Sequence, residues 1–93
     1  MRITSSEKQT IKQIVASVDP NARVYLFGSR ADDALKGGDI DLLVLSSKIT
    51  LMDRLDMLAG LHQKLGEQKI DLIVQPDLSK PFARLAVEQG VIL

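Results

Sequence analysis

Three aspartates lie within the two most apolar segments of the chain, where a carboxylate is costly to place. Asp39 and Asp41 open the segment Asp39–Leu45, and Asp71 lies in Lys69–Val74. Residues two apart on a strand point to the same face, so Asp39 and Asp41 would lie side by side, about 7 Å apart at their Cβ atoms. A hard divalent cation between them would relieve the repulsion of the two charges. The spacing therefore predicts a metal-binding pair.

A glycine and a serine follow another apolar segment. Arg23–Phe27 predicts a strand, and Gly28 and Ser29 come directly after it. Glycine lets a backbone approach a ligand closely, and serine offers an amide and a hydroxyl. If residues 29–35 begin a helix, its N-terminus adds N–H groups that bind phosphate. Arg30 is a phosphate contact, a counter-charge for the carboxylates or an ordinary surface arginine. These residue types favour a phosphate-containing ligand.

Alternating helix and strand patterns predict a single α/β (α+β) domain over residues 1–93. Its order is αβ(α)βαβα, a three-stranded mixed sheet with flanking helices. Thr4 and Glu7 have capping-box spacing before the first helix, Gly66 would end the second, and Ser79 would cap the third. The apolar positions of the three helices are Ile11, Ile14, Val15 and Val18, then Leu51, Leu55, Leu58, His62 and Leu65, then Phe82, Leu85 and Ala86. The last three are expected in the core.

The connections between the predicted strands bring the chemical residues together. A helical pattern over 51–65 joins the second and third strands, and such a crossover favours parallel neighbours. Parallel strands begin at the same edge of a sheet, so Asp71 should lie beside Asp39 and Asp41. The first strand reaches the second through a short connection, so we expect that pair to be antiparallel. The glycine–serine pair then lies at the same edge as the three aspartates.

Composition excludes several classes of function. Lys and Arg number 12 and Asp and Glu number 12, so the basic excess of a general polyanion binder is absent. There are three aromatic residues, no cysteine and one histidine, which argue against a base-stacking platform and against thiolate or histidine-rich metal sites. No apolar run is long enough for a membrane span, and the N-terminus lacks a signal-peptide core. We expect a soluble cytoplasmic domain that does not bind nucleic acid.

The run FGSRADDALKGGDIDLLV, with the later KIDLIV, resembles the nucleotidyltransferases of the polymerase-β type. Their signature is Gly-Ser, a spacer, Asp-x-Asp between apolar residues and a third Asp on a later strand. The small size and the closing AVEQGVIL are similar to the minimal nucleotidyltransferases, or MNT domains. The resemblance implies a nucleotidyltransferase fold, Mg²⁺ and a nucleoside triphosphate, which we expect to be ATP. It also implies roles for particular residues: Gly28 and Ser29, with Arg30 as a further candidate, would bind the nucleotide, and Asp39, Asp41 and Asp71 would be the catalytic metal ligands.

The same resemblance implies a partner. Many MNT proteins act as antitoxins beside a HEPN-domain toxin, and some transfer AMP onto it. We therefore expect a Mg²⁺-dependent enzyme that transfers AMP from ATP to a hydroxyl, on a HEPN-domain partner protein. One alternative is an antitoxin that neutralises the HEPN partner by occlusion, without catalysis. Another is a transferase acting on a small molecule, although the short chain leaves little surface for such a pocket.

Two positions depart from the pattern of many relatives. Asp32 and Asp33 stand where an Arg-Gly pair is common, which adds negative charge near the expected triphosphate. Gly38 stands where a Ser or Thr often precedes the first Asp. Neither departure removes an expected metal ligand.

Overall fold

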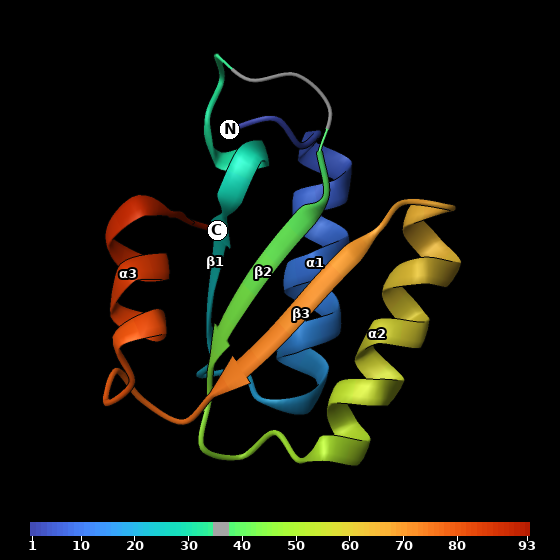
Figure 1. The fold of residues 1–93 in the computed structure, drawn as a ribbon. Helices are drawn as coiled ribbons and strands as arrows, with labels where there is room; N and C mark the ends of the chain where they lie inside the picture. The colour runs from blue at the N-terminus through green and yellow to red at the C-terminus, as the bar shows by residue number, and fades with distance from the viewer. Residues whose placement is uncertain (35–37) are drawn as a thin grey trace.

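A computed structural model describes residues 1–34 and 38–93 (Figure 1). The order of elements along the chain is helix, strand, short turn, strand, helix, strand, helix, strand. The elements are α1 (Ser5–Val18), β1 (Arg23–Phe27), the 3₁₀ turn η1 (Gly28–Ala31), β2 (Ile40–Leu45), α2 (Leu51–Leu65), β3 (Ile70–Gln75), α3 (Pro81–Gln89) and β4 (Val91–Ile92). No helix in these described ranges has both the length and the apolar character needed to cross a membrane.

The helix boundaries follow from capping residues. The predicted capping box of α1 is confirmed, since Thr4 and Glu7 exchange backbone-to-side-chain hydrogen bonds of 2.9 and 3.0 Å. The predicted end of α2 at Gly66 is also confirmed. The prediction that Ser79 caps α3 is wrong: Lys80 is the N-cap residue, and Pro81 occupies the first turn of the helix. A proline at that position has a fixed φ suited to a helix start and lacks only an N–H that would have no helical partner.

The sheet has the strand order β3-β2-β1-β4. As predicted, β2 runs parallel to β3 and antiparallel to β1. The prediction of three strands is wrong, because β4 pairs antiparallel with β1 and extends the sheet. A strand of two residues is too short to show an alternating pattern in the sequence. Gly90 precedes it, and a Cβ at this position would crowd the carbonyl oxygens of Leu26 and Ala86.

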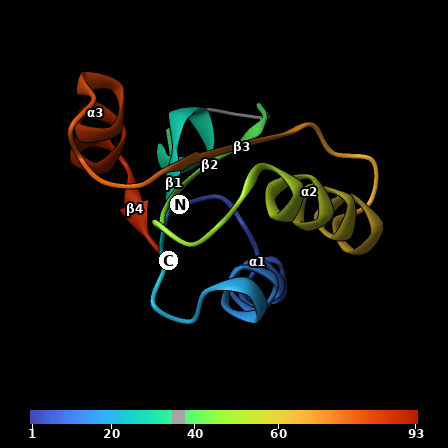
Figure 2. The same cartoon turned by 90° about the horizontal axis from the view of Figure 1, so that it is seen from below.

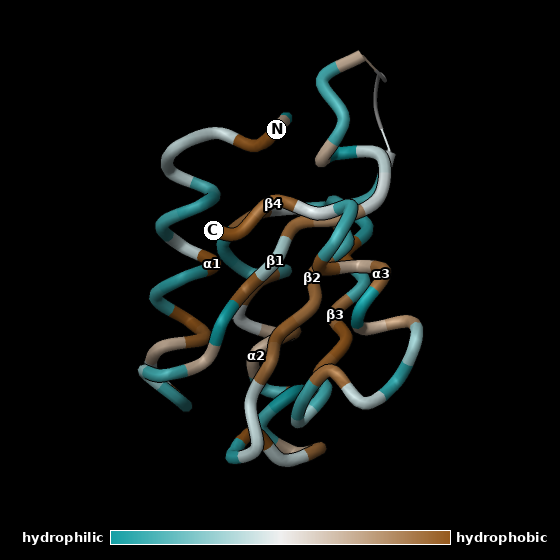
Figure 3. The backbone as a smooth tube through the Cα atoms, turned by 90° about the vertical axis from the view of Figure 1, so that its left-hand side faces the viewer, coloured by the Kyte–Doolittle hydropathy of each residue, from teal (hydrophilic) through white to brown (hydrophobic). Residues whose placement is uncertain are grey.

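Helices cover the two faces of the sheet unequally (Figure 2). Helices α1 and α2 pack on one face and enclose the larger core, which includes Ile40 and Leu42 of β2. Helix α3 packs on the opposite face, over a smaller cluster that includes Tyr25 and Leu43. The strands between these layers are predominantly hydrophobic, as the brown segments of Figure 3 show. Because α3 is short, it leaves part of its face of the sheet open.

Two predicted apolar stripes are placed differently from expectation. Phe82 and Leu85 were expected in the core but are 46% and 50% exposed, whereas Ala86 is buried as predicted, together with Ala83. Small alanines let α3 lie close to the sheet, while the ring of Phe82 packs edge-on against that of Phe27, with centroids 5.6 Å apart. In α2 the buried positions are Met57 and Leu61. The members of the predicted stripe that are exposed are Leu51, Leu55 and His62, while Leu58 and Leu65 are half-buried.

Candidate metal and nucleotide site

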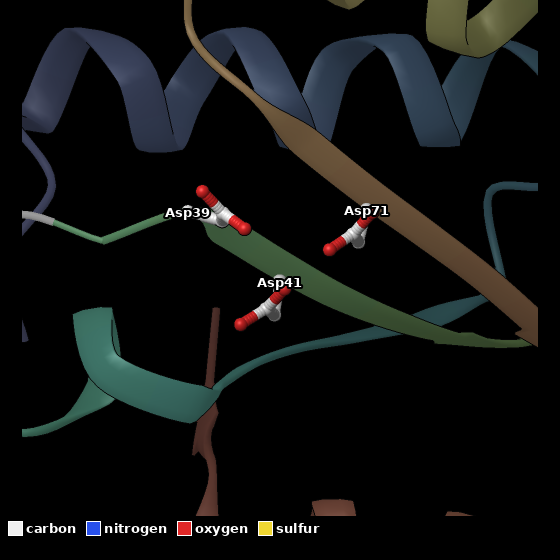
Figure 4. Close-up of side chains that lie close together, drawn as sticks. All are labelled: Asp39, Asp41 and Asp71. Carbon is white, nitrogen blue, oxygen red and sulfur yellow. The ribbon is translucent and has the colours of Figure 1, made fainter.

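Three carboxylates converge where β2 and β3 begin (Figure 4). Asp41 and Asp71 are direct partners in the parallel register, and Asp39 lies just before β2. One carboxylate oxygen from each of the three residues lies within 4.8 Å of the others. Asp39 and Asp41 are half-buried and Asp71 is exposed. The predicted convergence of the three aspartates is confirmed.

The apolar residues of β2 determine where these carboxylates point. Ile40 and Leu42 are fully buried against α1 and α2. Because side chains alternate along a strand, Asp41 must then point to the opposite face, the one that α3 covers in part. A cavity of about 370 Å³ opens along the outer edge of β3, where Asp41, Asp71 and Phe82 line it from this face and Arg54 and Leu58 of α2 from the other. The carboxylates of Asp41 and Asp71 are therefore open to a ligand at the edge of the sheet.

The electrostatics of the cluster favour a cation. Burial raises the pKa of Asp41 to about 6, aided by a hydrogen bond with Asp71 and by the negative charges of Asp71 and Asp39. Lys69 opposes this shift. A carboxylate whose charge is disfavoured in the free protein has the most to gain from a bound positive ion.

Lys69 is a site residue that the sequence reasoning missed. Its Nζ lies 3.5 Å from Oδ2 of Asp39. The signal was available in the parallel register: if Asp71 lies opposite Asp41, then Lys69, two residues earlier, lies near Asp39 and on the same face. Lys69 therefore supplies positive charge at the outer end of the carboxylate cluster.

Gly28 lies against the cluster, as predicted. The group it approaches closely is the carboxylate of Asp41, rather than a ligand. Its φ is +72°, in the region that favours glycine, and a Cβ there would overlap the carboxylate of Asp41. The turn η1 follows directly, and within it the carbonyl of Ser29 accepts a hydrogen bond of 3.2 Å from the N–H of Asp32. The end of β1 thus approaches the three carboxylates closely enough for one ligand to touch both.

Ser29 explains why a glycine precedes the first aspartate. Gly38 has a φ of +92°, and a Cβ at this position would overlap the hydroxyl oxygen of Ser29. A Ser or Thr at position 38 would have to displace that hydroxyl. The position of the Ser29 side chain therefore accounts for a glycine at position 38 in this chain.

Arg30 does not reach into the carboxylate cluster. Its guanidinium donates to the carbonyls of Arg2 and Gly38 and to the side chain of Gln68. Asp32 and Asp33 are exposed and are not members of the cluster. Their carboxylates accept hydrogen bonds from the N–H of Ala34 and from the N-terminal amine, respectively. Residues 35–37, part of the predicted helix over 29–35 and of the spacer, lie outside the described residues.

The donor set suits a hard divalent cation. Three carboxylate oxygens within 4.8 Å of one another are hard ligands of the kind that Mg²⁺ binds, and Mg²⁺ commonly combines such carboxylates with phosphate oxygens. Gly28, in the glycine–serine turn beside them, is exposed. The arrangement can hold a metal-bound phosphate ester at the edge of the sheet.

Comparison with known proteins places this chain in a family. The family described as "Polymerase beta, Nucleotidyltransferase" matches residues 9–93. A chain of the MntA-HpeT toxin–antitoxin complex, in a mutant form, is 25% identical with a TM-score of 0.71, over 92% of this chain and 69% of that one. A chain from the complex of the tri-AMPylated Shewanella oneidensis HEPN toxin with its MNT antitoxin has a TM-score of 0.72 and 23% identity, over 97% and 71% of the two chains, a likeness that shows the fold. No curated protein matches significantly. The chain belongs to the polymerase-β-type nucleotidyltransferase family.

Proposed function

We propose that this chain is a minimal nucleotidyltransferase that transfers AMP from ATP to a hydroxyl of a partner protein. The observation that supports it most is the meeting of Asp39, Asp41 and Asp71 beside the glycine–serine turn, in a chain of this family. The attacking hydroxyl oxygen would form a bond to the α-phosphorus, and the bond between the α-phosphorus and the oxygen that bridges to the β-phosphorus would break, releasing pyrophosphate. The hydroxyl proton passes to solvent or to a nearby base.

The residues would divide the work as follows. Asp39 and Asp41 would hold the Mg²⁺ ions, and Asp71 would complete the coordination on the side from which the acceptor enters. Bound Mg²⁺ would lower the pKa of the attacking hydroxyl and neutralise charge on the phosphates. Gly28 and Ser29 would hold the triphosphate through their backbone and hydroxyl groups. The apolar wall around Phe82 borders the same opening.

We propose a HEPN-domain protein as the partner and acceptor. The similar solved structures are of toxin–antitoxin complexes, one of them with a tri-AMPylated HEPN toxin. In-line attack requires the acceptor hydroxyl to come within roughly 3–3.5 Å of the phosphorus. The exposed position of Asp71 and the open cavity beside it would admit a hydroxyl on a flexible segment of the partner.

Occlusion without catalysis is the second candidate. The observation that favours it is that Arg30, a cation expected to bind phosphate, donates its hydrogen bonds within the protein instead. The exposed Asp32 and Asp33 add negative charge on the same side. In this case the chain would bind the HEPN protein, and its nucleotide site would be secondary.

Co-expression with a HEPN-domain protein from the same genome would separate the two candidates. Intact-mass spectrometry should find one or more AMP groups on the HEPN protein. Asp41→Asn should abolish the adduct and the protection from toxicity, whereas Asp56→Asn, at an exposed position of α2, should change neither. If Asp41→Asn still protects the cell and still co-purifies with the partner, occlusion is the mechanism and the transferase proposal fails.

A further inference from the structure

A group of polar side chains joins the segments that lead into the metal-binding carboxylates. We call it the arginine clamp, and it consists of Arg2, Glu7, Arg30 and Gln68. We propose that Arg30 is a positioning residue: it holds the backbone that places Asp39, and it does not bind the triphosphate. The proposal rests on the proposed function only through the metal site that Asp39, Asp41 and Asp71 would form.

Arg30 uses three of its donors within the protein. Its Nε donates to the carbonyl of Gly38 at 3.1 Å, its Nη1 to the carbonyl of Arg2 at 3.0 Å and its Nη2 to Oε1 of Gln68 at 3.2 Å. Gly38 immediately precedes Asp39. Gln68 lies three residues before Asp71. One planar group therefore fixes the approach of both strands that supply metal ligands.

Gln68 is itself held in a single orientation. Its Nε2 donates to Oε2 of Glu7 and to the carbonyl of Leu65, both at 2.9 Å, which turns its Oε1 toward Arg30. The hydrogen bond from Gln68 is also the main reason that the pKa of Glu7 is lowered. Because Glu7 is part of the α1 capping box, the clamp is anchored on a helix rather than on a loop.

The N-terminal segment closes the clamp from the other side. Arg2 donates from Nη2 to the carbonyl of Ser29 at 2.8 Å and from Nε to the carbonyl of Asp32 at 3.1 Å. The N–H of Arg2 also donates to the carbonyl of Arg30 at 2.8 Å. Arg2 thus ties the N-terminal segment to the turn that carries Ser29, and Arg30, which lies in that turn, ties it to the segment that carries Asp39.

This arrangement argues against a direct phosphate contact by Arg30. Three of the five N–H donors of the guanidinium are already used, and moving the group onto a triphosphate would break its hydrogen bonds to Gly38, Arg2 and Gln68. Holding them instead keeps the carboxylate of Asp39 near those of Asp41 and Asp71. Groups that orient metal ligands in this way typically affect metal affinity by 10- to 100-fold.

Charge and position predict opposite effects on metal binding. If Arg30 acted only through its charge, replacing it with a neutral residue would remove repulsion and tighten the binding of a cation. If it positions Asp39, the same replacement weakens binding. Lys69 offers the matched control: it lies 3.5 Å from the Asp39 carboxylate, its side chain is 72% exposed, and it makes no contact with the clamp among the described hydrogen bonds.

Titration of the apo protein with Mn²⁺ alone, followed by electron paramagnetic resonance, tests the proposal without any acceptor or nucleotide. Arg30→Gln should weaken Mn²⁺ binding by about tenfold or more, and Lys69→Gln should tighten it. Gln68→Ala, which keeps the charge of Arg30, should weaken it by a smaller factor. Arg30→Lys also keeps the charge but loses the planar three-way contact, so it should weaken binding as well.

The outcomes separate two failures. Wild-type-like or tighter Mn²⁺ binding by Arg30→Gln overturns the positioning role, as does unchanged binding by both Gln68→Ala and Arg30→Lys. Absence of Mn²⁺ binding by the wild-type protein overturns the proposed function, and the positioning role with it. Circular dichroism checks that each variant is folded; if Arg30→Gln is not, Gln68→Ala and Arg30→Lys decide.

Discussion

The two ends of β2 shift the pKa of a nearby carboxyl group in opposite directions. Ser46 directly follows β2, and beside it lies Asp19, from the end of α1. Asp19 is buried, 4% exposed, and accepts hydrogen bonds from the hydroxyl of Ser46 at 2.5 Å and the N–H of Asn21 at 3.0 Å. These bonds, that of Ser46 foremost, lower the pKa of Asp19. At the first end of the strand, burial and neighbouring acids raise the pKa of Asp41.

The difference shows which carboxylate serves the fold and which is available to a ligand. Ser46 also accepts hydrogen bonds from the N–H groups of Lys48 and Ile49, so Asp19 completes a network that shapes the turn after β2. Asp41 instead faces Asp39 and Asp71, which are acceptors when ionised. A carboxylate with donors from its own chain stabilises the folded state, whereas clustered carboxylates are stabilised by an external cation.

The largest expected effect is on catalysis. Asp41→Asn should lower AMP transfer by at least about 10³-fold, because metal stabilisation of several kcal/mol is lost and each 1.36 kcal/mol is about tenfold. Its melting temperature without metal should be unchanged or higher, since one of three mutually repelling charges is removed. Radiolabelled transfer and thermal melting measure the two quantities. A large loss of stability would make the carboxylate structural, like Asp19.

Asp19→Ala should have the reverse profile. Ser46 and Asn21 lose their acceptor in a buried turn, so the melting temperature should fall clearly. Mn²⁺ affinity should stay close to wild type, because the network lies at the opposite end of β2. Asp77→Ala is the control: its carboxylate also accepts a backbone hydrogen bond, from Ser79, but is exposed, so its removal should cost less. Equal losses in the two variants would contradict the contrast between the strand ends.

Gly28→Ala should damage the site and the fold together. The backbone there has a φ of +72°, which costs a residue with a Cβ about 1–2 kcal/mol, and the new methyl would overlap the Asp41 carboxylate. Gly66→Ala is a matched control, because Gly66 has a φ of +80° and nothing within 4 Å of the added Cβ. Both variants should lose stability in denaturant unfolding, but only Gly28→Ala should also weaken Mn²⁺ binding. Equal Mn²⁺ affinities would remove Gly28 from the site.

The smallest expected effect is on the pH dependence of stability. The pKa of Asp41 rises from 3.8 to about 6 on folding, so the folded protein binds this proton more tightly than the unfolded chain. That contribution is complete below pH 3.8 and is lost as the pH rises through about 6. For Asp19, whose pKa is lowered, the contribution is present above pH 3.8 and is lost as the pH falls through its folded value.

Melting curves of the metal-free protein measure this difference. Relative to wild type, Asp41→Asn should gain stability as the pH rises from 3.8 through about 6, and excess Mg²⁺ should reduce that gain at the upper end. A flat difference between the two proteins over this range would mean that Asp41 is not perturbed in the free protein.

The carboxylate site could be predicted from local pattern because strand geometry has few alternatives. In the DIDLLVL segment, Ile40 and Leu42 must face a core, so the aspartates between them must face away. The helix between β2 and β3 requires a parallel pair, and this puts Asp71 opposite Asp41. Both steps depend only on the alternation of side chains and on the length of a connection.

Contacts between distant segments could not be predicted in the same way. The partners of Arg30 come from residues 2, 38 and 68, and no sequence period links them. Strand β4 forms because its two residues pair with the edge of β1 that β2 does not occupy. The exposure of Phe82 depends on how closely Ala83 lets α3 approach the sheet. The alternation of side chains and the length of the connections therefore determined from sequence which residues form the site. Only the tertiary structure decided which residues hold that site in place, because contacts between remote segments depend on three-dimensional proximity that a local pattern does not encode.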